Sequence, residues 1–334
     1  MNHEMNKENY LPDAVDDAAP SNIDPDMTRF MALQSEDGAA FARWDLGTAA
    51  QAREAFEAIR RRWVSGGPQM HRTVERHVPT RYGDVRIRVY YPSERATLPA
   101  LIYLHGGGFV VFSLDTHDRV MREYASRAGI AVVGVDYSRA PEARFPRALE
   151  EIVDVTRWVH HHADSLGVDA RALLIGGDSA GANLSLGTAL QLRDAAQPLL
   201  CGMLFNYGAF DMIPWRDSYA RFGGGEYSLS SHDMVCFVNR YINHRDDLSD
   251  SRCRPINASL DQLPPACFAV AELDPLYDEN LEMAERLRDA GVPVSATVYP
   301  GTVHSFLEAV SIAGISDRAF TEQAEWIKRC IGIA

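Results

Sequence analysis

The sequence predicts an α/β fold in which an eight-stranded, mostly parallel sheet is covered by helices on both faces. Short apolar runs rich in valine, isoleucine and leucine recur along the chain, and helix-length segments separate most of them. Two strands without a helix between them come first. Strands that alternate with helices pair in parallel, because each helix crosses back over one face of the sheet.

The elements follow one another in a regular order from residue 73 onward. Residues 73–78 and the alternating segment 85–90 predict two strands joined by a turn at Tyr82-Gly83-Asp84. Six more strands are expected at 100–104, 131–135, 172–175, 199–205, 267–271 and 294–299, and helices at 117–128, 146–165, 180–193 and 278–290. In such sheets, binding sites form at the carboxyl ends of the strands.

Two regions lie outside this pattern and predict a lid over the strand ends. Residues 27–63 are helical in pattern, with one apolar face made by Ala52, Ala55, Phe56, Ile59 and Trp63. The interval between the strands at 199–205 and 267–271 is too long for a plain loop, so we expect a helical insertion there. The acidic, Asn- and Pro-rich residues 1–26 are expected to be mobile or to wrap loosely over the body.

Composition excludes several classes of partner. The chain has 46 acidic and 33 basic residues and a net charge of −13, which argues against nucleic acid and anionic membranes. It has no apolar run long enough to span a membrane and no apolar core in its first residues, so we expect no secretory signal. The five cysteines form no C-x-x-C pair, as expected for reduced thiols of a cytoplasmic protein rather than for disulfides or a zinc site.

A candidate nucleophile, Ser179, lies in the sequence Gly-Asp-Ser-Ala-Gly at residues 177–181. Apolar residues 173–175 predict a buried strand before it, and the segment from Ala182 predicts a helix after it. A serine at a sharp strand-to-helix turn is held in a strained conformation that projects its hydroxyl, and small neighbours allow close approach. The alternative is a glycine-rich connection with an ordinary surface serine, which the strand-turn-helix context disfavours.

A serine hydroxyl needs a base and a third group that orients the base. Asp274 and His304 each follow a predicted strand, in the order Ser, Asp, His. Asp274 could instead only cap the next helix, and Asp278 and Glu272 remain rival acids. The consecutive histidines 160–162 point about 100° apart on a helix, so they form a solvated face rather than a ligand set.

A glycine loop, His-Gly-Gly-Gly-Phe at residues 105–109, directly follows the strand 100–104. Three glycines allow backbone N–H groups to face a substrate oxygen at close range, as an oxyanion hole requires. The alternative is a phosphate-binding loop. A dinucleotide fingerprint would need glycine at Val111, and a P-loop would need Lys-Ser or Lys-Thr at Ala182-Asn183, so both nucleotide interpretations fail.

With these residues the chain resembles the hormone-sensitive-lipase family of α/β-hydrolase esterases, most of all the bacterial acetyl esterases. The resemblance runs from about Val78 to the C-terminus. It rests on HGGGF at 105–109, DTHD at 115–118, DYSRAPEARFPRALEE at 136–151, GDSAG at 177–181, DPL at 274–276 and YPGTVHSF at 299–306.

The resemblance implies the α/β-hydrolase fold with a helical cap, made by residues 1–70 and an insertion at about 208–255 on a catalytic domain of residues 71–334. It also implies that Ser179 is the nucleophile, Asp274 the acid and His304 the base. The oxyanion hole would be formed by the N–H groups of Gly106, Gly107, Gly108 and Ala180, with His105 structural. Ser138-Arg139 and Asn206-Tyr207-Gly208 depart from the residues of many relatives, and the second departure affects the acyl preference.

The expected function is hydrolysis of small acetyl to butyryl esters through an acyl-enzyme, without metal or organic cofactor. We expect Phe109, Phe205 and Tyr207 to contact substrate, with Phe205, Tyr207 and Phe210 shortening the acyl pocket. Charged residues in the expected lid argue against a lipase: Arg216, Asp217, Arg221, Glu226, His232, Asp233 and Arg240. Two alternatives remain: an amidase or peptidase using the same triad, and a non-catalytic small-molecule receptor, which the presence of His304 disfavours. The chain is compatible with a monomer or a homodimer.

Overall fold

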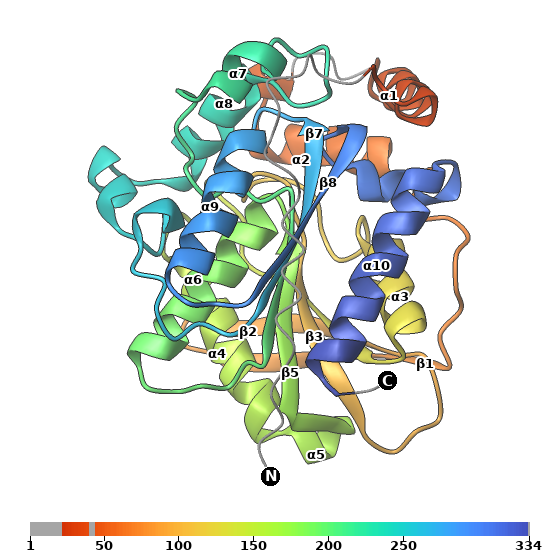
Figure 1. Ribbon diagram of the computed structural model, residues 1–334, viewed down its shortest axis with the longest axis vertical. Coiled ribbons are helices and arrows are strands. Elements are labelled where there is room, and N and C mark those ends of the chain that lie inside the picture. The colour runs from red at the N-terminus through yellow and green to blue at the C-terminus, as the bar shows by residue number, and fades with distance from the viewer. Residues whose placement is uncertain (1–21, 40–43, 333–334) are drawn as a thin grey trace.

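The sheet has the predicted architecture in the computed structural model, which describes residues 22–39 and 44–332 (Figure 1). Its order is β1-β2-β4-β3-β5-β6-β7-β8. The first two strands pair antiparallel with each other, and β2 pairs antiparallel with β4, whereas the remaining pairs are parallel. The strands are β1 (Arg72–Thr80), β2 (Gly83–Tyr91), β3 (Leu98–Leu104), β4 (Ala131–Val135), β5 (Val168–Asp178), β6 (Gly202–Asn206), β7 (Ala266–Leu273) and β8 (Val294–Val303).

The chain reverses its direction of travel across the sheet after β4, because β3 lies between β4 and β5. The parallel register brings the carboxyl ends of three strands together, since Gly177 pairs with Leu104 and Asp178 with Asn206. Open α/β sheets bind ligands at such a switch point. The topology therefore places the loops after β3, β5 and β6 at one site.

Helices cover both faces of the sheet, and each face has its own apolar core. One layer consists of α4 (Arg147–His161), α5 (Ala163–Leu166), α6 (Ala180–Asp194) and α9 (Tyr277–Asp289), and the other of α3 (Asp118–Ala128) and α10 (Gly314–Cys330) (Figure 1). Alternate residues of β3 face the two layers: Ile102 packs in the first core, and Leu101 and Tyr103 pack in the second.

Two helical segments differ from the expectation. The predicted helix at 146–165 is interrupted at His162, whose backbone N–H and Nδ1 both contact the Trp158 carbonyl oxygen and end α4. The sequence analysis did not identify α10. Its buried residues Phe320, Ala324 and Ile327 follow a helical spacing, and Phe320 packs edge-on against Tyr124 of α3.

The helical regions outside the main pattern lie over the carboxyl ends of the strands (Figure 1). They are α1 (Pro25–Gly38), η2 (Trp44–Leu46), α2 (Ala49–Arg60), α7 (Asp217–Phe222) and α8 (Ser231–Tyr241), with the short turns η3 (Arg245–Ser249), η4 (Pro255–Asn257) and η5 (Phe306–Ser311) near them in the chain or the fold. Most of the segment expected to be mobile, residues 1–21, lies outside the described residues. Asp24 caps α1, and its N–H donates to the Gly301 carbonyl.

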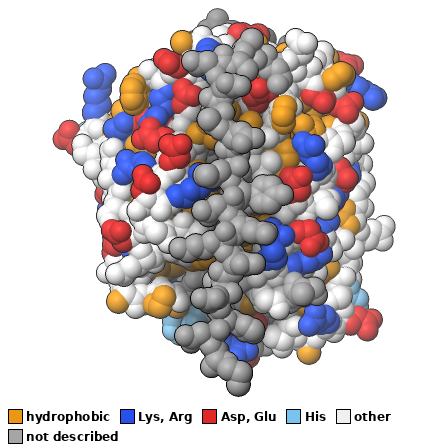
Figure 2. Space-filling view, viewed as in Figure 1, with side chains coloured by type: hydrophobic (Ala, Val, Ile, Leu, Met, Phe, Trp, Pro, Cys, Tyr) orange, Lys and Arg blue, Asp and Glu red, His pale blue; other side chains and the backbone are white. Residues whose placement is uncertain are grey.

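The described surface agrees with an acidic globular protein. Acidic and basic side chains are interspersed over the face shown in Figure 2, so the net charge is not gathered into one patch there. Within the described ranges, no helix combines the length and apolarity needed to cross a bilayer.

Candidate active site

Ser179 occupies a strained turn between β5 and α6. Its φ of 53° and ψ of −117° lie where non-glycine residues are rare. The turn is also crowded, because a Cβ atom at Gly177 or Gly181 would overlap the Leu104 carbonyl oxygen of the neighbouring strand. Only glycine fits at these two flanking positions, and the serine side chain is thereby directed to the cavity at the strand ends.

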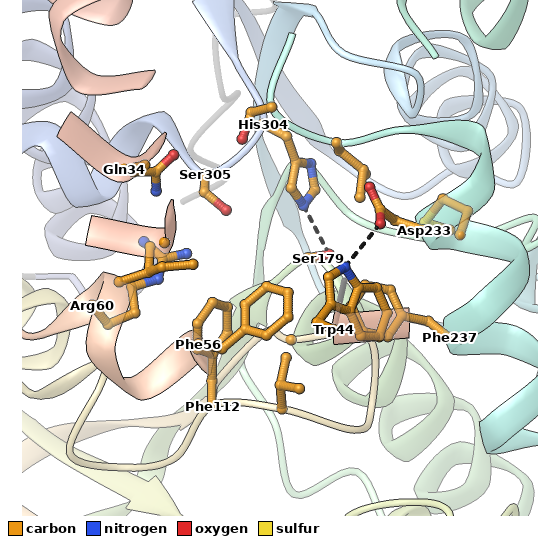
Figure 3. A pocket seen from close by; sticks show the side chains of 18 of the residues that line it. Gln34, Trp44, Phe56, Arg60, Phe112, Ser179, Asp233, Phe237, His304 and Ser305 are labelled. Atoms are coloured by element: carbon orange, nitrogen blue, oxygen red, sulfur yellow. Dashed lines mark hydrogen bonds between the residues drawn. The ribbon is translucent and has the colours of Figure 1, made fainter. Parts of the chain in front are cut away.

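A hydrogen-bonded relay joins the three candidate catalytic side chains. His304 Nε2 lies 3.0 Å from Ser179 Oγ (Figure 3). On the other side of the ring, His304 Nδ1 lies 2.7 Å from Asp274 Oδ2. All three side chains are buried. With the carboxylate accepting from Nδ1–H, the lone pair on Nε2 faces the serine hydroxyl. This arrangement can remove the hydroxyl proton.

The sequence left two roles open for Asp274, and the structure shows its carboxylate on His304 rather than as the side-chain cap of α9. The Asp274 Oδ1 atom accepts the N–H of Leu276 at 2.9 Å, just before α9, while Oδ2 accepts from His304. The rival acids are engaged elsewhere. Asp278 accepts the N–H of Ser218, and Glu272 accepts the N–H of Gly301.

Two of the predicted glycines line the cavity. Gly107 and Gly108 have φ values of 110° and 56° and line the cavity together with Ala180, the first residue of α6. No hydrogen bond within the described part of the chain uses these three N–H groups. Unpaired N–H groups beside Ser179, one of them at a helix N-terminus, can stabilise a developing oxyanion.

The third predicted glycine has a different position. The Gly106 N–H donates to Asp178 Oδ1 at 3.1 Å, and Gly106 does not line the cavity. A Cβ atom there would overlap the Asp178 carboxylate, so glycine is required for this close approach. Gly106 therefore anchors the loop rather than donating to a substrate, which corrects the expectation of three donors from this loop.

His105 supports the loop from behind, as the resemblance implied. Its Nδ1 lies 2.7 Å from the Gly106 carbonyl oxygen, and its ring stacks on Tyr137 with centroids 4.4 Å apart. Burial lowers the pKa of His105 to about 3, with the nearby His117 acting in the same direction. His105 is therefore a neutral hydrogen-bond donor to the loop.

Replacing Gly108 with alanine is expected to lower kcat at least about 10²-fold, the typical effect of losing one oxyanion donor. Alanine is disfavoured at φ 56°, and its Cβ would overlap the ring of Phe237, so the loop must shift. Steady-state kinetics on an aryl ester checks this. The matched control is Gly129→Ala, which has a φ of 67° but open space around the added Cβ atom. Equal losses of activity in both variants would contradict the expectation.

The cavity above Ser179 has a volume of about 610 Å³ and a largely apolar wall. Four aromatic rings from three parts of the chain form much of that wall: Trp44, Phe56, Phe112 and Phe237 (Figure 3). Trp44 stacks on Phe237 with centroids 4.7 Å apart, and Phe56 packs edge-on against Phe112 at 5.3 Å. The predicted contact residue Phe109 also lines the cavity.

Phe205 and Tyr207 do not line this cavity, which corrects their predicted place in the acyl pocket. Phe205 points into the core, where its ring packs on Phe210 and Phe268. Tyr207 lies behind His304, with ring centroids 5.0 Å apart. Regular strand alternation would place these two side chains on the same face of the sheet, but they pack in different cores because Tyr207, just after β6, has a positive φ of 37° that breaks the alternation.

The charged lid residues also lie differently from the expectation. Of the seven named in the sequence analysis, only Glu226 and Asp233 line the cavity. Arg216 pairs with Asp211 at 2.7 Å. The inner face of α8 instead presents Met234, Phe237 and Val238 to the cavity. The helix is amphipathic, so its charged residues do not oppose apolar substrates.

Comparison with known proteins agrees with this geometry. A family model described as alpha/beta hydrolase fold matches residues 101–308. A hyperthermophilic esterase from the archaeon Pyrobaculum calidifontis is 34% identical, with a TM-score of 0.87 over 94% of this chain and 100% of that chain. The thermostable carboxylesterase EstE1 from a metagenomic library is 33% identical, with a TM-score of 0.83 over 85% of this chain and 98% of that chain.

A third similar structure is an ester hydrolase from the Lake Arreo metagenome, 30% identical, with a TM-score of 0.88 over 93% of this chain and 99% of that chain. A particular closeness to bacterial acetyl esterases stays a prediction. The family match covers more than half of the chain, and the sheet order and the turn at Ser179 agree with it. This chain therefore belongs to the α/β-hydrolase family, and its solved structural neighbours are esterases.

Proposed function

We propose that the protein is a serine carboxylesterase that hydrolyses small esters through an acyl-enzyme. The observation that carries this proposal is the contact of 3.0 Å between Ser179 Oγ and His304 Nε2, beside a cavity bordered by the N–H groups of Gly107, Gly108 and Ala180. The esterase activity of the structural neighbours supports the same reaction class.

In the proposed first half-reaction, Ser179 Oγ attacks the ester carbonyl carbon while His304 Nε2 takes the hydroxyl proton. The carbonyl oxygen becomes an oxyanion that accepts hydrogen bonds from the free N–H groups. Asp274 keeps Nδ1–H directed at itself and stabilises the imidazolium. His304 then gives the proton to the leaving alcohol oxygen as the C–O bond breaks, which leaves an acyl ester on Ser179.

The second half-reaction repeats these roles with water as the nucleophile. His304 removes a proton from water, the hydroxide attacks the acyl carbon, and the same N–H groups hold the second oxyanion. Proton return to Ser179 Oγ releases the carboxylic acid. The proton transfers between Ser179 and His304 use groups that already lie within hydrogen-bond distance of each other.

We further propose that the preferred acyl groups run from acetyl to butyryl. The cavity volume of about 610 Å³ lies in the middle of the range typical for small-molecule sites. An acyl group and an alcohol must share that volume, and Phe56, Phe112 and Phe237 already occupy part of the space near Ser179 (Figure 3). Each buried methylene contributes up to about 0.8 kcal/mol, but only where there is room for it.

With a series of p-nitrophenyl esters, kcat/KM is expected to be highest from acetyl to butyryl and to fall steeply by octanoyl, without activation at a lipid–water interface. Initial rates across the series, with and without emulsified substrate, measure this. An optimum at octanoyl or longer would refute the proposed acyl range but not the esterase activity. Absence of any ester hydrolysis, with cleavage of an anilide or with tight binding alone, would support the amidase or receptor alternative.

Two variants show which wall sets the acyl range. Phe56→Ala is expected to raise kcat/KM for octanoyl relative to butyryl esters, because it removes a ring from the cavity wall. Tyr207→Ala is the matched control: it removes a ring that packs on His304 outside the cavity, so it should lower activity by the same factor at every chain length.

A further inference from the structure

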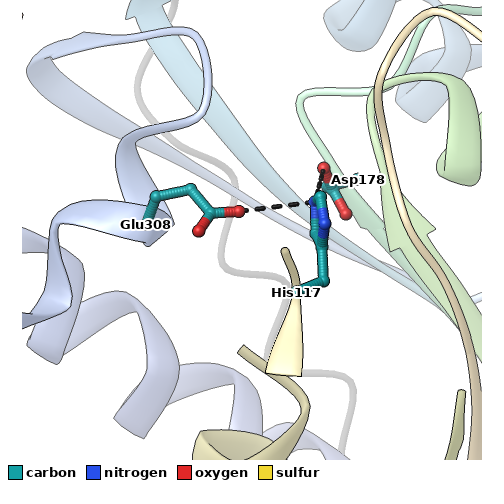
Figure 4. Close-up of side chains that lie close together, drawn as sticks. All are labelled: His117, Asp178 and Glu308. Carbon is teal, nitrogen blue, oxygen red and sulfur yellow. Dashed lines mark hydrogen bonds and ion pairs between the residues drawn. The ribbon is translucent and has the colours of Figure 1, made fainter. Parts of the chain in front are cut away.

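A second cluster of ionisable side chains lies directly behind the turn that carries Ser179 (Figure 4). His117 Nε2 lies 3.2 Å from Asp178 Oδ2 and 3.4 Å from Glu308 Oε1. All three side chains are at most 3% exposed. They come from the start of α3, the end of β5 and η5, respectively.

Arg60, the last residue of α2, adds a fourth buried charge. Its Nη1 lies 3.2 Å from Glu308 Oε2, its side chain is 2% exposed, and the guanidinium stacks on the Phe112 ring at 4.4 Å. The Nε and Nη1 atoms of Arg60 make no hydrogen bond within the described chain. Arg60 is thus held by its ion pair with Glu308 and by its stacking on Phe112, rather than by two parallel hydrogen bonds to a carboxylate.

With Asp178 and Glu308 both ionised, the four groups balance when His117 carries a proton. Burial by itself would lower the pKa of His117, but Asp178 and Glu308 outweigh it and raise that pKa. Burial likewise acts to raise the pKa of Asp178, yet His117 and the Tyr103 hydroxyl hold it at about 2. Two carboxylates then face one guanidinium and one imidazolium, with no net charge. A buried charge without its partner is strongly destabilising.

Three members of this buried network also belong to segments that form the candidate catalytic site. Asp178 precedes Ser179 and accepts the N–H of Gly106, so it joins the nucleophile turn to the glycine loop. Glu308 lies in η5, which follows His304 in the same loop. Arg60 ends α2, and it lines the cavity together with Phe56 of the same helix (Figure 3).

We propose that Arg60 is a positioning residue for ester hydrolysis: by pairing with Glu308 it completes a charge-balanced network, Arg60–Glu308–His117–Asp178, that holds the glycine loop, the Ser179 turn and the His304 loop in register. The inference rests on the proposed esterase function. Full activity would then require that α2 packs over the strand ends, because α2 supplies the guanidinium of Arg60.

A metal ion is the competing occupant of this cluster, because His117, Asp178 and Glu308 could supply three ligand atoms within 4.8 Å of one another. The Arg60 guanidinium beside Glu308 already provides the positive charge that an ion would bring, and it would repel a cation. A proton on His117 is sufficient to balance the carboxylates. The structure therefore favours protonated His117 over a metal site.

Other groups facing the network constrain its titration. They come from β3, the loops after it and after β4, and the end of β6: Tyr103, His105, Thr116, Arg139 and Tyr207. None of them carries a negative charge at neutral pH, and His105 is neutral there because burial lowers its pKa to about 3. The charge of the network near neutral pH thus depends on Arg60, Glu308, His117 and Asp178.

The test is a double-mutant cycle with Arg60→Met and Glu308→Gln, assayed with p-nitrophenyl butyrate from pH 6 to pH 9. Arg60→Met leaves one uncompensated negative charge and is expected to lower kcat about tenfold or more at pH 9. The loss should be smaller at pH 6, since protonation of Glu308 restores neutrality. Glu308→Gln leaves one excess positive charge while His117 is protonated, so its activity should fall at pH 6 relative to pH 9.

The double variant keeps only the neutral His117–Asp178 pair and is expected to recover most of the activity lost in Arg60→Met. Arg60→Lys should retain most activity, because it preserves the charge. The control Arg62→Met removes an exposed arginine of the same region, which pairs with Asp37, and should match the wild type. Thermal melting shows whether each variant is folded. If Arg60→Met does not fold, the pH profile of Glu308→Gln alone tests the proposal.

Three results would overturn the proposal: a double variant whose loss equals the product of the single losses, pH profiles of both single variants parallel to the wild type, or a stoichiometric metal that is present in the wild type and absent from His117→Ala. Any of them is distinguishable from failure of the esterase proposal, in which the wild type itself would not hydrolyse the ester.

Discussion

Replacing Ser179 with alanine is expected to abolish ester hydrolysis, lowering kcat by about 10⁶-fold, while the protein remains folded. Losing the nucleophile of a serine hydrolase typically costs about this much, because the other members of the triad then have no hydroxyl to activate. Alanine replaces the hydroxyl by a hydrogen at a site where the backbone turn is held by the flanking glycines and by the bond from the Ser179 N–H to the Asn206 carbonyl. Stopped assays with p-nitrophenyl butyrate and a thermal melt measure the two parts of the prediction.

Labelling with an organophosphate provides a second readout for the same residue. One phosphoryl group should add per chain, on Ser179, and none should add to the Ser179→Ala variant. A suitable control is Ser305→Ala, because Ser305 also lines the cavity but is not part of the relay. A label on Ser305, or near-native turnover by Ser179→Ala, would contradict the assignment of Ser179 as the nucleophile.

The second largest effect is expected from Asp274→Asn, which should lower kcat by about 10⁴-fold. The asparagine amide can no longer accept from His304 Nδ1–H with a full negative charge. The imidazole then adopts the tautomer with its proton on Nε2, facing Ser179, where a lone pair is needed. The Leu276 N–H keeps an oxygen acceptor in the variant, so the start of α9 should be preserved.

Asp278→Asn is the matched control for Asp274→Asn, since Asp278 is four residues away and accepts a backbone N–H from Ser218 rather than from His304. It should stay within a few-fold of the wild type. In combination with Ser179→Ala, neither Asp274→Asn nor His304→Ala should lower activity much further, because the three side chains act as one unit. A larger loss in Asp278→Asn than in Asp274→Asn would show that the acid has been misidentified.

Much of the site could be predicted because its signals are local in the sequence. The turn at Ser179 needs glycine on both sides, and the crowding against Leu104 in the structure explains why. Asp274 and His304 each follow a strand end, and parallel strands bring such ends to one edge of a sheet. The eight-stranded, mostly parallel sheet, the lid regions and the glycine loop could be expected from the same local patterns, whereas the order of the strands could not.

The directions of side chains across the site could not be obtained in this way. Phe205 lies in β6 and Tyr207 comes just after it, as expected. However, Phe205 points into the core and Tyr207 lies behind His304. Phe56 was expected only as part of an apolar helix face, yet it lines the cavity, and Trp44, Phe112 and Phe237 carry no pattern that marks them as a wall. Such a wall is assembled from distant segments, as the stacked rings of Trp44 and Phe237 are nearly 200 residues apart in the chain.

The sequence by itself determined the sheet, the strained serine turn and the three side chains of the relay, because each depends on short-range backbone geometry and on strand ends that parallel pairing must bring together. Only the tertiary structure decided that Gly106 donates to Asp178 instead of to the cavity, and that Arg60 reaches Glu308 behind the site. The first contact joins residues 72 apart in the chain, and the second depends on how α2 packs against a loop more than 200 residues away. The position of α2 is determined by side-chain packing and by the pairing of buried charges, and no local sequence pattern predicts either of them.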